Sequence, residues 1–299
     1  MSAEALLQQL EWTVLRRLDG LLQGDHQTLF RGAGLELADL REYQTHDDVR
    51  HIDWNVTARM QTPYVREHQE DREISAWFLL DLSGSMDFAS AGQSKRELML
   101  AFVAIMAKLL MQRGNRIGAL ILSPADASGF KYIPARMGRR RRHLLHVLHT
   151  AQTTGVAKAP HQTDLNQWLA RANGLLKRRS CVFVVSDFMG HFDWAKELSH
   201  LGRRHDTVAA RLYDPVEMQL PNAGLMTLQD SESSEQLLID TANPLFRKRY
   251  AKLVEERELQ LQTTFAQSGV DALELSTDED IAAALLKFSE LRKRRLWRA

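Results

Sequence analysis

Two kinds of hydrophobic repeat alternate along most of the chain. After position 74, continuous apolar runs of strand length are separated by longer stretches in which apolar residues recur at helical spacing. Alternation of this kind favours an α/β fold whose mostly parallel sheet is joined by right-handed crossovers. The predicted strands are 75–81, 116–122, 130–134, 180–186, 207–213 and 271–275, the predicted helices are 98–111, 137–152, 164–177, 192–204, 243–268 and 278–295, and a hairpin is expected at 225–240.

The chain before position 74 follows a different pattern. Residues 4–23 repeat apolar positions at helical spacing and predict an amphipathic helix that ends near Gly24. From Gln27 to Glu73, short apolar pieces stand among dense charge, which favours strands and turns over long helices. We therefore predict two parts. Residues 1–73 form a helix and a small, charged, β-rich segment, and residues 74–299 form the α/β domain with its C-terminal helices.

The composition is that of an ordinary soluble globular protein, with 44% hydrophobic residues, 26% charged residues and a net charge of +1. Cys181 is the only cysteine, so intramolecular disulfides and cysteine-based zinc sites are excluded. The N-terminus lacks the features of a signal peptide, and the most apolar helix, 98–111, is too short to cross a bilayer. We expect a cytoplasmic protein that does not insert into membranes.

The charge clusters do not indicate a nucleic-acid partner or a catalytic site. The basic runs 139–142 and 292–295 have no accompanying pattern of stacking aromatics and no nucleic-acid motif. We interpret both runs as solvated helix faces and expect no nucleic-acid partner. The acid and base pairs of residues 36–73 are mixed with aromatic residues, and for them we favour a structural or docking role over a catalytic one.

Oxygen donors gather where two predicted strands end. Asp81, Ser83 and Ser85 follow the apolar run 76–80, and Asp187 follows the strand 180–186. In an open α/β sheet, ligands bind at the carboxyl ends of the strands, and oxygen ligands of this kind suit Mg²⁺. These four donors cannot complete a shell of about six oxygens, so a further one is expected in the chain, and Thr163 before the helix 164–177 is the candidate.

Each donor also has a plainer interpretation. Ser and Asp side chains in a turn can satisfy local backbone groups, and Thr163 could simply cap the next helix, for which Asp164 is an equally good cap. A turn explains the loop 81–86 alone, whereas a cation site explains donors at three separate places. We therefore prefer the cation site.

The set Asp81-x-Ser83-x-Ser85, then Thr163, then Asp187 resembles the metal-ion-dependent adhesion site of von Willebrand factor A domains. The resemblance implies a Rossmann-like sheet with helices on both faces. It also implies that Ser83, Ser85 and Thr163 contact the cation and that Asp81 and Asp187 act through water. In that family the last coordination position is left for a carboxylate from a partner protein, so we expect binding rather than turnover.

Motifs in the charged N-terminal part narrow the resemblance. The segments 34–43, 47–54, 57–59 and 65–67 are similar to the signature of the domain of unknown function 58 family, although His46 stands where a Gly is expected. Members join this signature to an A domain and typically act with MoxR-type AAA+ ATPases. The resemblance implies a non-enzymatic adaptor or co-chaperone that binds Mg²⁺, or Mn²⁺ or Ca²⁺, and works with such an ATPase in protein remodelling.

The alternative is a metal-dependent, phosphatase-like hydrolase that uses Asp81, since haloacid dehalogenase-like enzymes also begin with an Asp after the first strand. Those enzymes place a second Asp two residues later as general acid, and here that position is Ser83. Neither serine lies in a G-x-S-x-G turn, and no nucleotide-binding glycine motif follows any strand. Both absences favour the binding module over the enzyme.

Overall fold

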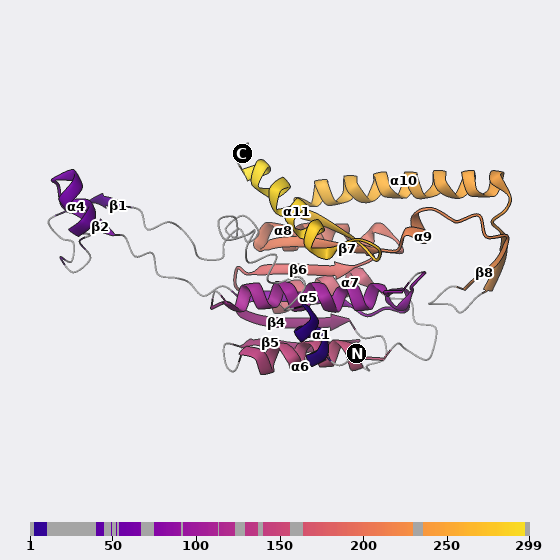
Figure 1. The fold of residues 1–299 in the computed structure, drawn as a ribbon, viewed down its shortest axis with the longest axis horizontal. Coiled ribbons are helices and arrows are strands. Elements are labelled where there is room, and N and C mark those ends of the chain that lie inside the picture. Colours follow the sequence, from indigo (N-terminus) through magenta and orange to yellow (C-terminus); the bar gives the residue numbers. More distant parts are fainter. Residues whose placement is uncertain are drawn as a thin grey trace.

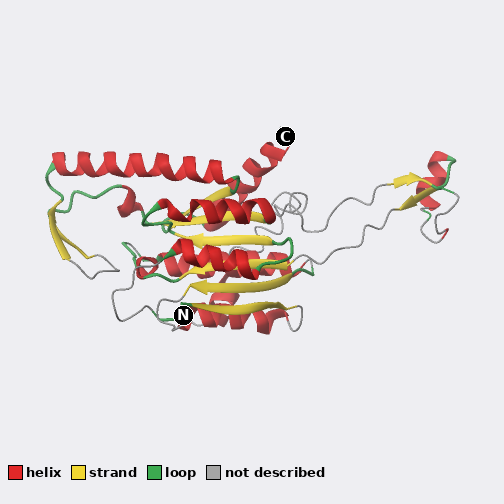
Figure 2. Ribbon diagram, turned by 180° about the vertical axis from the view of Figure 1, so that it is seen from behind, coloured by secondary structure: helices red, strands yellow, loops and turns green. Residues whose placement is uncertain are grey.

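A six-stranded sheet with helices on both faces forms the main body of the chain, seen here in a computed structural model (Figure 1). The structure describes residues 3–10, 40–44, 49, 52, 54–66, 75–90, 92–112, 114–122, 129–136, 140–155, 164–229 and 236–296. Figure 2 shows the same layers from behind.

The sheet has the strand order β10-β7-β6-β3-β4-β5. All neighbours are parallel except β4 and β5, which pair antiparallel. The predicted fold class, an α/β fold with a mostly parallel sheet between helices, is therefore confirmed. The strands are β3 (Ser75–Asp81), β4 (Arg116–Leu122), β5 (Phe130–Arg136), β6 (Cys181–Ser186), β7 (Asp206–Tyr213) and β10 (Asp271–Ser276).

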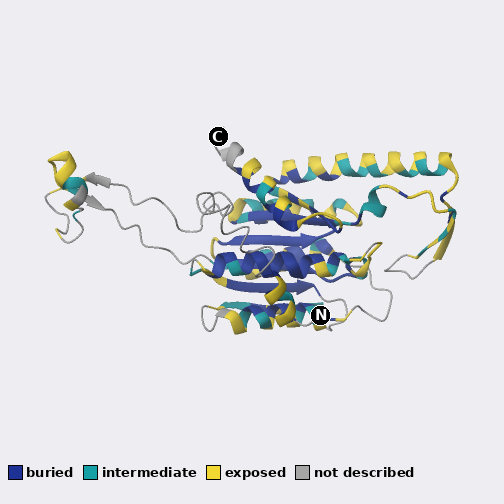
Figure 3. Ribbon diagram, in the orientation of Figure 1, coloured by how far each residue is buried: buried dark blue, intermediate teal, exposed yellow. Residues whose placement is uncertain are grey.

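Helices cover both faces of the sheet because the central strands are apolar on both. Phe78 and Leu80 of β3 point into one core, and Trp77 and Leu79 point into the other. Figure 3 shows these strands buried throughout. The first core is closed by α1 (Ala3–Leu10), α5 (Lys95–Gln112), α6 (Arg140–Thr153) and α11 (Ile281–Leu296), and the second by α7 (Leu165–Leu175), α8 (Ala195–Arg204) and α10 (Pro244–Ser268).

Helix α5 is buried on nearly every side, as the apolar run 98–111 predicted. A capping box stands at its start. The Ser94 N–H donates to Glu97 Oε2 at 3.1 Å, and the Glu97 N–H donates to Ser94 Oγ at 3.2 Å. The cap places the first helical residue at Lys95, so a lysine enters the interior of the molecule at the end of the helix next to the loop of β3.

Smaller elements complete the described part. The predicted hairpin is present as β8 (Leu225–Gln229) and β9 (Gln236–Asp240), paired antiparallel. Near the N-terminus, β1 (Leu40–Glu42) pairs with β2 (Tyr64–Arg66) beside α4 (Trp54–Met60). Of the predicted helix 4–23, residues 11–23 lie outside the described residues, and the division of the chain at 73 stays a prediction. Among the described helices, none has the length and apolar composition to cross a membrane.

Arg292 corrects the interpretation of the run 292–295 as a solvated face. Its side chain is buried, its Nε donates to Asp271 Oδ2 at 2.8 Å, and it also pairs with Asp206. The physical reason is helical spacing, because position 292 lies four residues after the buried Phe288 and therefore on the same face of α11. The first residue of the run thus anchors α11 to the amino ends of β7 and β10.

Gly118 in the middle of β4 provides a test of how tightly the second core is packed. A Cβ atom at this position would lie 2.6 Å from the Trp77 ring and 2.9 Å from the Ala135 backbone nitrogen. We expect Gly118→Ala to lower the free energy of unfolding by about 1–3 kcal/mol in chemical denaturation, because the added methyl group overpacks the core. Gly174→Ala is the control for a glycine with room for a Cβ atom, because nothing lies within 4 Å of that position. In helix α7 it should not lower the free energy of unfolding, since Ala favours the helix over Gly. If Gly118→Ala left the free energy of unfolding unchanged, this description of the packing would be contradicted.

Candidate cation site

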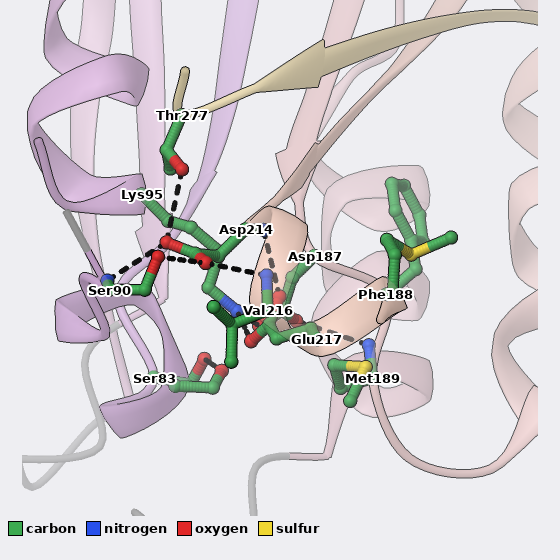
Figure 4. Close-up of polar contacts among 12 residues, drawn as sticks. Ser83, Ser90, Lys95, Asp187, Phe188, Met189, Asp214, Val216, Glu217 and Thr277 are labelled. Carbon is green, nitrogen blue, oxygen red and sulfur yellow. Dashed lines mark hydrogen bonds and ion pairs between the residues drawn. The ribbon is translucent and has the colours of Figure 1, made fainter. Parts of the chain in front are cut away.

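Three acidic residues stand side by side at the carboxyl edge of the sheet. Asp81 ends β3, Asp187 follows β6, and Asp214 follows β7. Since these three strands are parallel neighbours, their carboxyl ends meet, and all three carboxylates are buried. Figure 4 shows Asp187 and Asp214 with their polar partners. Uncompensated, such a concentration of negative charge would be costly, so the partners of each carboxylate decide what the site can bind.

Asp81 organises the loop that follows β3. Its Oδ1 accepts the Ser83 N–H at 2.9 Å, and its Oδ2 accepts the Ser186 hydroxyl at 2.7 Å. The hydroxyl oxygens of Ser83 and Ser85 lie 3.1 Å apart. Two neighbouring ligands of an octahedral Mg²⁺, each about 2.1 Å from the ion, would lie about 3 Å apart, so the two hydroxyls are spaced as a pair of ligands would be.

These groups face a pocket of about 720 Å³. Asp81, Ser83, Ser85 and Asp187 all line it, so the structure brings four of the five predicted donors together. Among the described residues, no group of three or more His, Cys, Asp or Glu side chains is placed to hold a metal ion. A cation at this point of the pocket would therefore be held by the serine hydroxyls together with the neighbouring carboxylates of Asp81 and Asp187.

The fifth predicted donor, Thr163, lies outside the described residues. The next residue, Asp164, lines the same pocket and caps α7, because its Oδ1 accepts the Gln167 N–H at 2.8 Å. The capping role that was the plainer interpretation of Thr163 therefore belongs to Asp164.

Asp81 carries a negative charge that no described Lys, Arg or His side chain neutralises. Burial, and then the nearby charge of Asp187, raise the pKa of Asp81 from 3.8 to about 6. The hydrogen bonds from Ser186 and Ser83 act in the opposite direction but are weaker. The site thus lacks positive charge beside Asp81. A divalent cation bound there would supply it.

Asp187 is balanced by Lys95, which the sequence analysis did not single out. The Lys95 ammonium is fully buried and lies 2.8 Å from Asp187 Oδ2 and 2.6 Å from Glu217 Oε1 (Figure 4). Burial acts to lower the pKa of Lys95, but the charges of Asp187 and Glu217 outweigh it and raise the pKa above its usual value. The signal that could have found Lys95 is its position directly after the capping Ser94, at the start of a wholly apolar helix.

Asp214 was also missed, and it joins three loops of the site. Its carboxylate accepts both the N–H and the hydroxyl of Ser90, at 3.0 and 2.5 Å, and the hydroxyl of Thr277 at 3.0 Å. It also caps the short helix α9 (Pro215–Met218) by accepting the Val216 N–H at 3.0 Å. The sequence signal is the capping box of Asp214 and Glu217 around Pro215. Asp214 therefore holds the loops in place without facing the pocket.

Comparisons with known sequences point to one family. The family model described as "Protein of unknown function DUF58" matches residues 39–260. Similar proteins include uncharacterized proteins of Mycobacterium tuberculosis and Mycobacterium bovis, each 37% identical over 292 residues, which is 97% of this chain and 90% of theirs.

Solved structures with a similar arrangement have low sequence identity. They include BatB from Bacteroides thetaiotaomicron, with a TM-score of 0.46, 12% identity and coverage of 74% of this chain and 98% of that one. A von Willebrand factor type A protein from Catenulispora acidiphila has a TM-score of 0.34 at 12% identity, covering 74% of this chain and 42% of that one. The fold class rests on the sheet of this chain itself.

The buried lysine gives a first test of the charge balance. We expect Lys95→Met to lower the free energy of unfolding by about 3–5 kcal/mol, because it leaves the buried Asp187 carboxylate unpaired. The measurement is denaturant unfolding at neutral pH. Lys252→Met is the matched control, since Lys252 is exposed and pairs with Glu256 at 3.7 Å on the surface of α10. Its effect should stay within about 0.5 kcal/mol, and equal losses in the two variants would contradict the account.

The raised pKa of Asp81 gives a second test. Between its ordinary pKa of 3.8 and its folded pKa of about 6, the folded state binds more protons than the unfolded state, so the free energy of unfolding falls as the pH rises through this window. Asp81→Asn removes this loss. With a chelator present to remove divalent cations, the stability of the variant relative to wild type should therefore be greater at about pH 7.5 than at about pH 4.5. If the difference in stability between the variant and wild type does not change with pH, the pKa of Asp81 is not raised by folding.

Proposed function

The chain belongs to the family of proteins of unknown function DUF58, as its N-terminal motifs predicted, and from this premise we propose that it is a divalent-cation-dependent protein-interaction module. One observation carries the proposal. The uncompensated carboxylate of Asp81 lies behind two serine hydroxyls spaced like neighbouring metal ligands, at the wall of an open pocket. Cation binding would supply the positive charge that this arrangement lacks.

In this proposal Ser83 and Ser85 bind Mg²⁺ or Mn²⁺ directly, and Thr163 adds a third hydroxyl. Asp81 orients the loop through the Ser83 N–H, and Asp187 is held in place by Lys95 and by the Met189 N–H at 3.1 Å. These carboxylates would bind the ion through water. A position facing the pocket stays open for a carboxylate from the partner protein.

The serine environment supports binding rather than turnover. A nucleophilic serine needs an adjacent base, usually a histidine within hydrogen-bond reach. The hydroxyl of Ser83 pairs with the hydroxyl of Ser85 instead, and neither bonds to a histidine among the described residues. Position 83 also lacks the carboxylate that the hydrolase alternative needs as a general acid. We therefore propose a non-enzymatic role.

The partner in this proposal is a MoxR-type AAA+ ATPase, and the protein acts as its adaptor or co-chaperone. Family membership supports this partner, and the lack of a phosphate-binding glycine motif in the sequence assigns ATP hydrolysis to the ATPase.

Thermal unfolding with and without Mg²⁺ tests the cation. At a concentration about 100 times the Kd, the ion should stabilise the folded chain by about 2.7 kcal/mol. Asp81→Asn should lose most of this gain, because the loop carboxylate no longer attracts the ion. Asp193→Asn is the matched control, since Asp193 lines the pocket but is exposed and was not predicted as a donor. Equal stabilisation of wild type and Asp81→Asn would refute the site.

Co-purification with a MoxR-type ATPase tests the partner. A chelator would also remove the Mg²⁺ that the ATPase needs for its nucleotide, so the site should be changed by substitution. We expect Ser83→Ala with Ser85→Ala to abolish retention of the ATPase in Mg²⁺, whereas Asp193→Asn retains it. Retention that is equal for both variants, or ATP hydrolysis by the isolated chain, would contradict the proposal.

A further inference from the structure

The β8–β9 hairpin has one apolar face. Met226 pairs with Ile239, and Leu228 pairs with Leu237. Residues directly opposite one another in an antiparallel ladder project to the same side, so these four side chains share a face. The opposite face carries Leu225, Thr227, Gln229, Gln236, Leu238 and Asp240.

The exposure of the apolar face increases from one end of the hairpin to the other. Ile239 is 5% exposed, whereas Leu237, at the other end of the face, is 64% exposed. Leu228, the partner of Leu237, lines the pocket that contains Ser83 and Ser85. Through Leu228, the apolar face of the hairpin therefore borders the pocket of the candidate cation site.

A second apolar group, Met189, lies at the same pocket on the turn after β6 and is 48% exposed. The turn is held in an uncommon conformation, because Phe188 has a φ of 52°, which a bulky residue rarely adopts. The Phe188 ring packs against Trp194 and Phe265, with centroids 5.1 and 5.0 Å apart, and Arg257 donates to the Phe188 carbonyl at 3.0 Å. The surroundings thus enforce the conformation that leaves Met189 exposed beside the pocket.

The size and charge of the pocket indicate what could fill it. A volume of about 720 Å³ is far more than a cation and one carboxylate occupy, and it lies within the range of about 300–1,000 Å³ typical of pockets that enclose whole ligands. Without a cation the pocket repels acidic groups, so an acidic segment would bind only to the loaded site. Five of the described residues that line the pocket carry carboxylates, namely Asp81, Asp164, Asp187, Asp193 and Glu217.

We propose that Leu228, Leu237 and Met189 form, together with the cation, one docking surface for an acidic–apolar segment of a partner protein. The carboxylate of the segment fills the open coordination position, and a large apolar side chain next to it is buried against the hairpin and Met189. This inference rests on the proposed function, because the carboxylate is held only when the cation is bound.

The test uses a random-peptide library displayed on phage, selected on the immobilised full-length chain in Mg²⁺ and eluted with EDTA. The recovered peptides should share an Asp or Glu beside a large apolar residue. Binding of these peptides is then measured by fluorescence anisotropy on variants of the hairpin and the turn. Leu237→Ser and Met189→Ser should each weaken binding about tenfold, because each removes apolar surface that the peptide buries.

Leu225→Ser is the matched control, because Leu225 is 72% exposed on the opposite face of the same hairpin. It should leave affinity within about twofold of wild type, since a surface substitution away from the contact changes little. If EDTA releases acidic peptides that have no apolar neighbour, or if Leu237→Ser and Met189→Ser bind as well as wild type, this inference is overturned and the proposed function stands. If EDTA releases no more phage from wild type than from Asp81→Asn, the proposed function itself fails.

Discussion

Unequal compensation of buried negative charge is the constraint on which the rest of this structure depends. The parallel order of β3, β6 and β7 places Asp81, Asp187 and Asp214 at one edge of the sheet. Asp187 is paired with a buried ammonium, and Asp214 is surrounded by N–H and hydroxyl donors. Asp81 receives two hydrogen bonds but no positive charge, and its burial, followed by the nearby charge of Asp187, raises its pKa. The edge is therefore stable except at one point, and that point faces the pocket.

The compensating groups also join distant parts of the chain. Lys95 at the start of α5 connects the end of β6 with α9, and the Tyr250 hydroxyl donates to the Glu217 carbonyl oxygen at 2.8 Å from α10. The hairpin lies in the chain between α9 and α10. The loop after β3, the turn that exposes Met189 and the hairpin are thus carried by elements that are bonded to one another. Such an arrangement suits a surface that presents charged and apolar groups at fixed positions.

The sequence predicted the sheet well because buried parallel strands are continuous apolar runs, and β3 and β4 have the predicted bounds. Asp81, Ser83, Ser85 and Asp187 could be placed because they directly follow such runs. Lys95 and Arg292 could not, since each is a charged residue buried by partners more than 20 residues away in the sequence, and local pattern assigns charge to the surface. Asp214 had a legible capping signal, but its bonds to Ser90 and Thr277 depend on strand order.

The central claim is that Ser83 and Ser85 hold a divalent cation beside Asp81. The most direct measurement is anomalous diffraction from crystals of the full chain grown with Mn²⁺. The account predicts a peak about 2.2 Å from both serine oxygens, with the Asp81 carboxylate farther away behind water, since these are oxygen-ligand distances for ions of this class. A peak bound elsewhere, or none at saturating Mn²⁺, would contradict it.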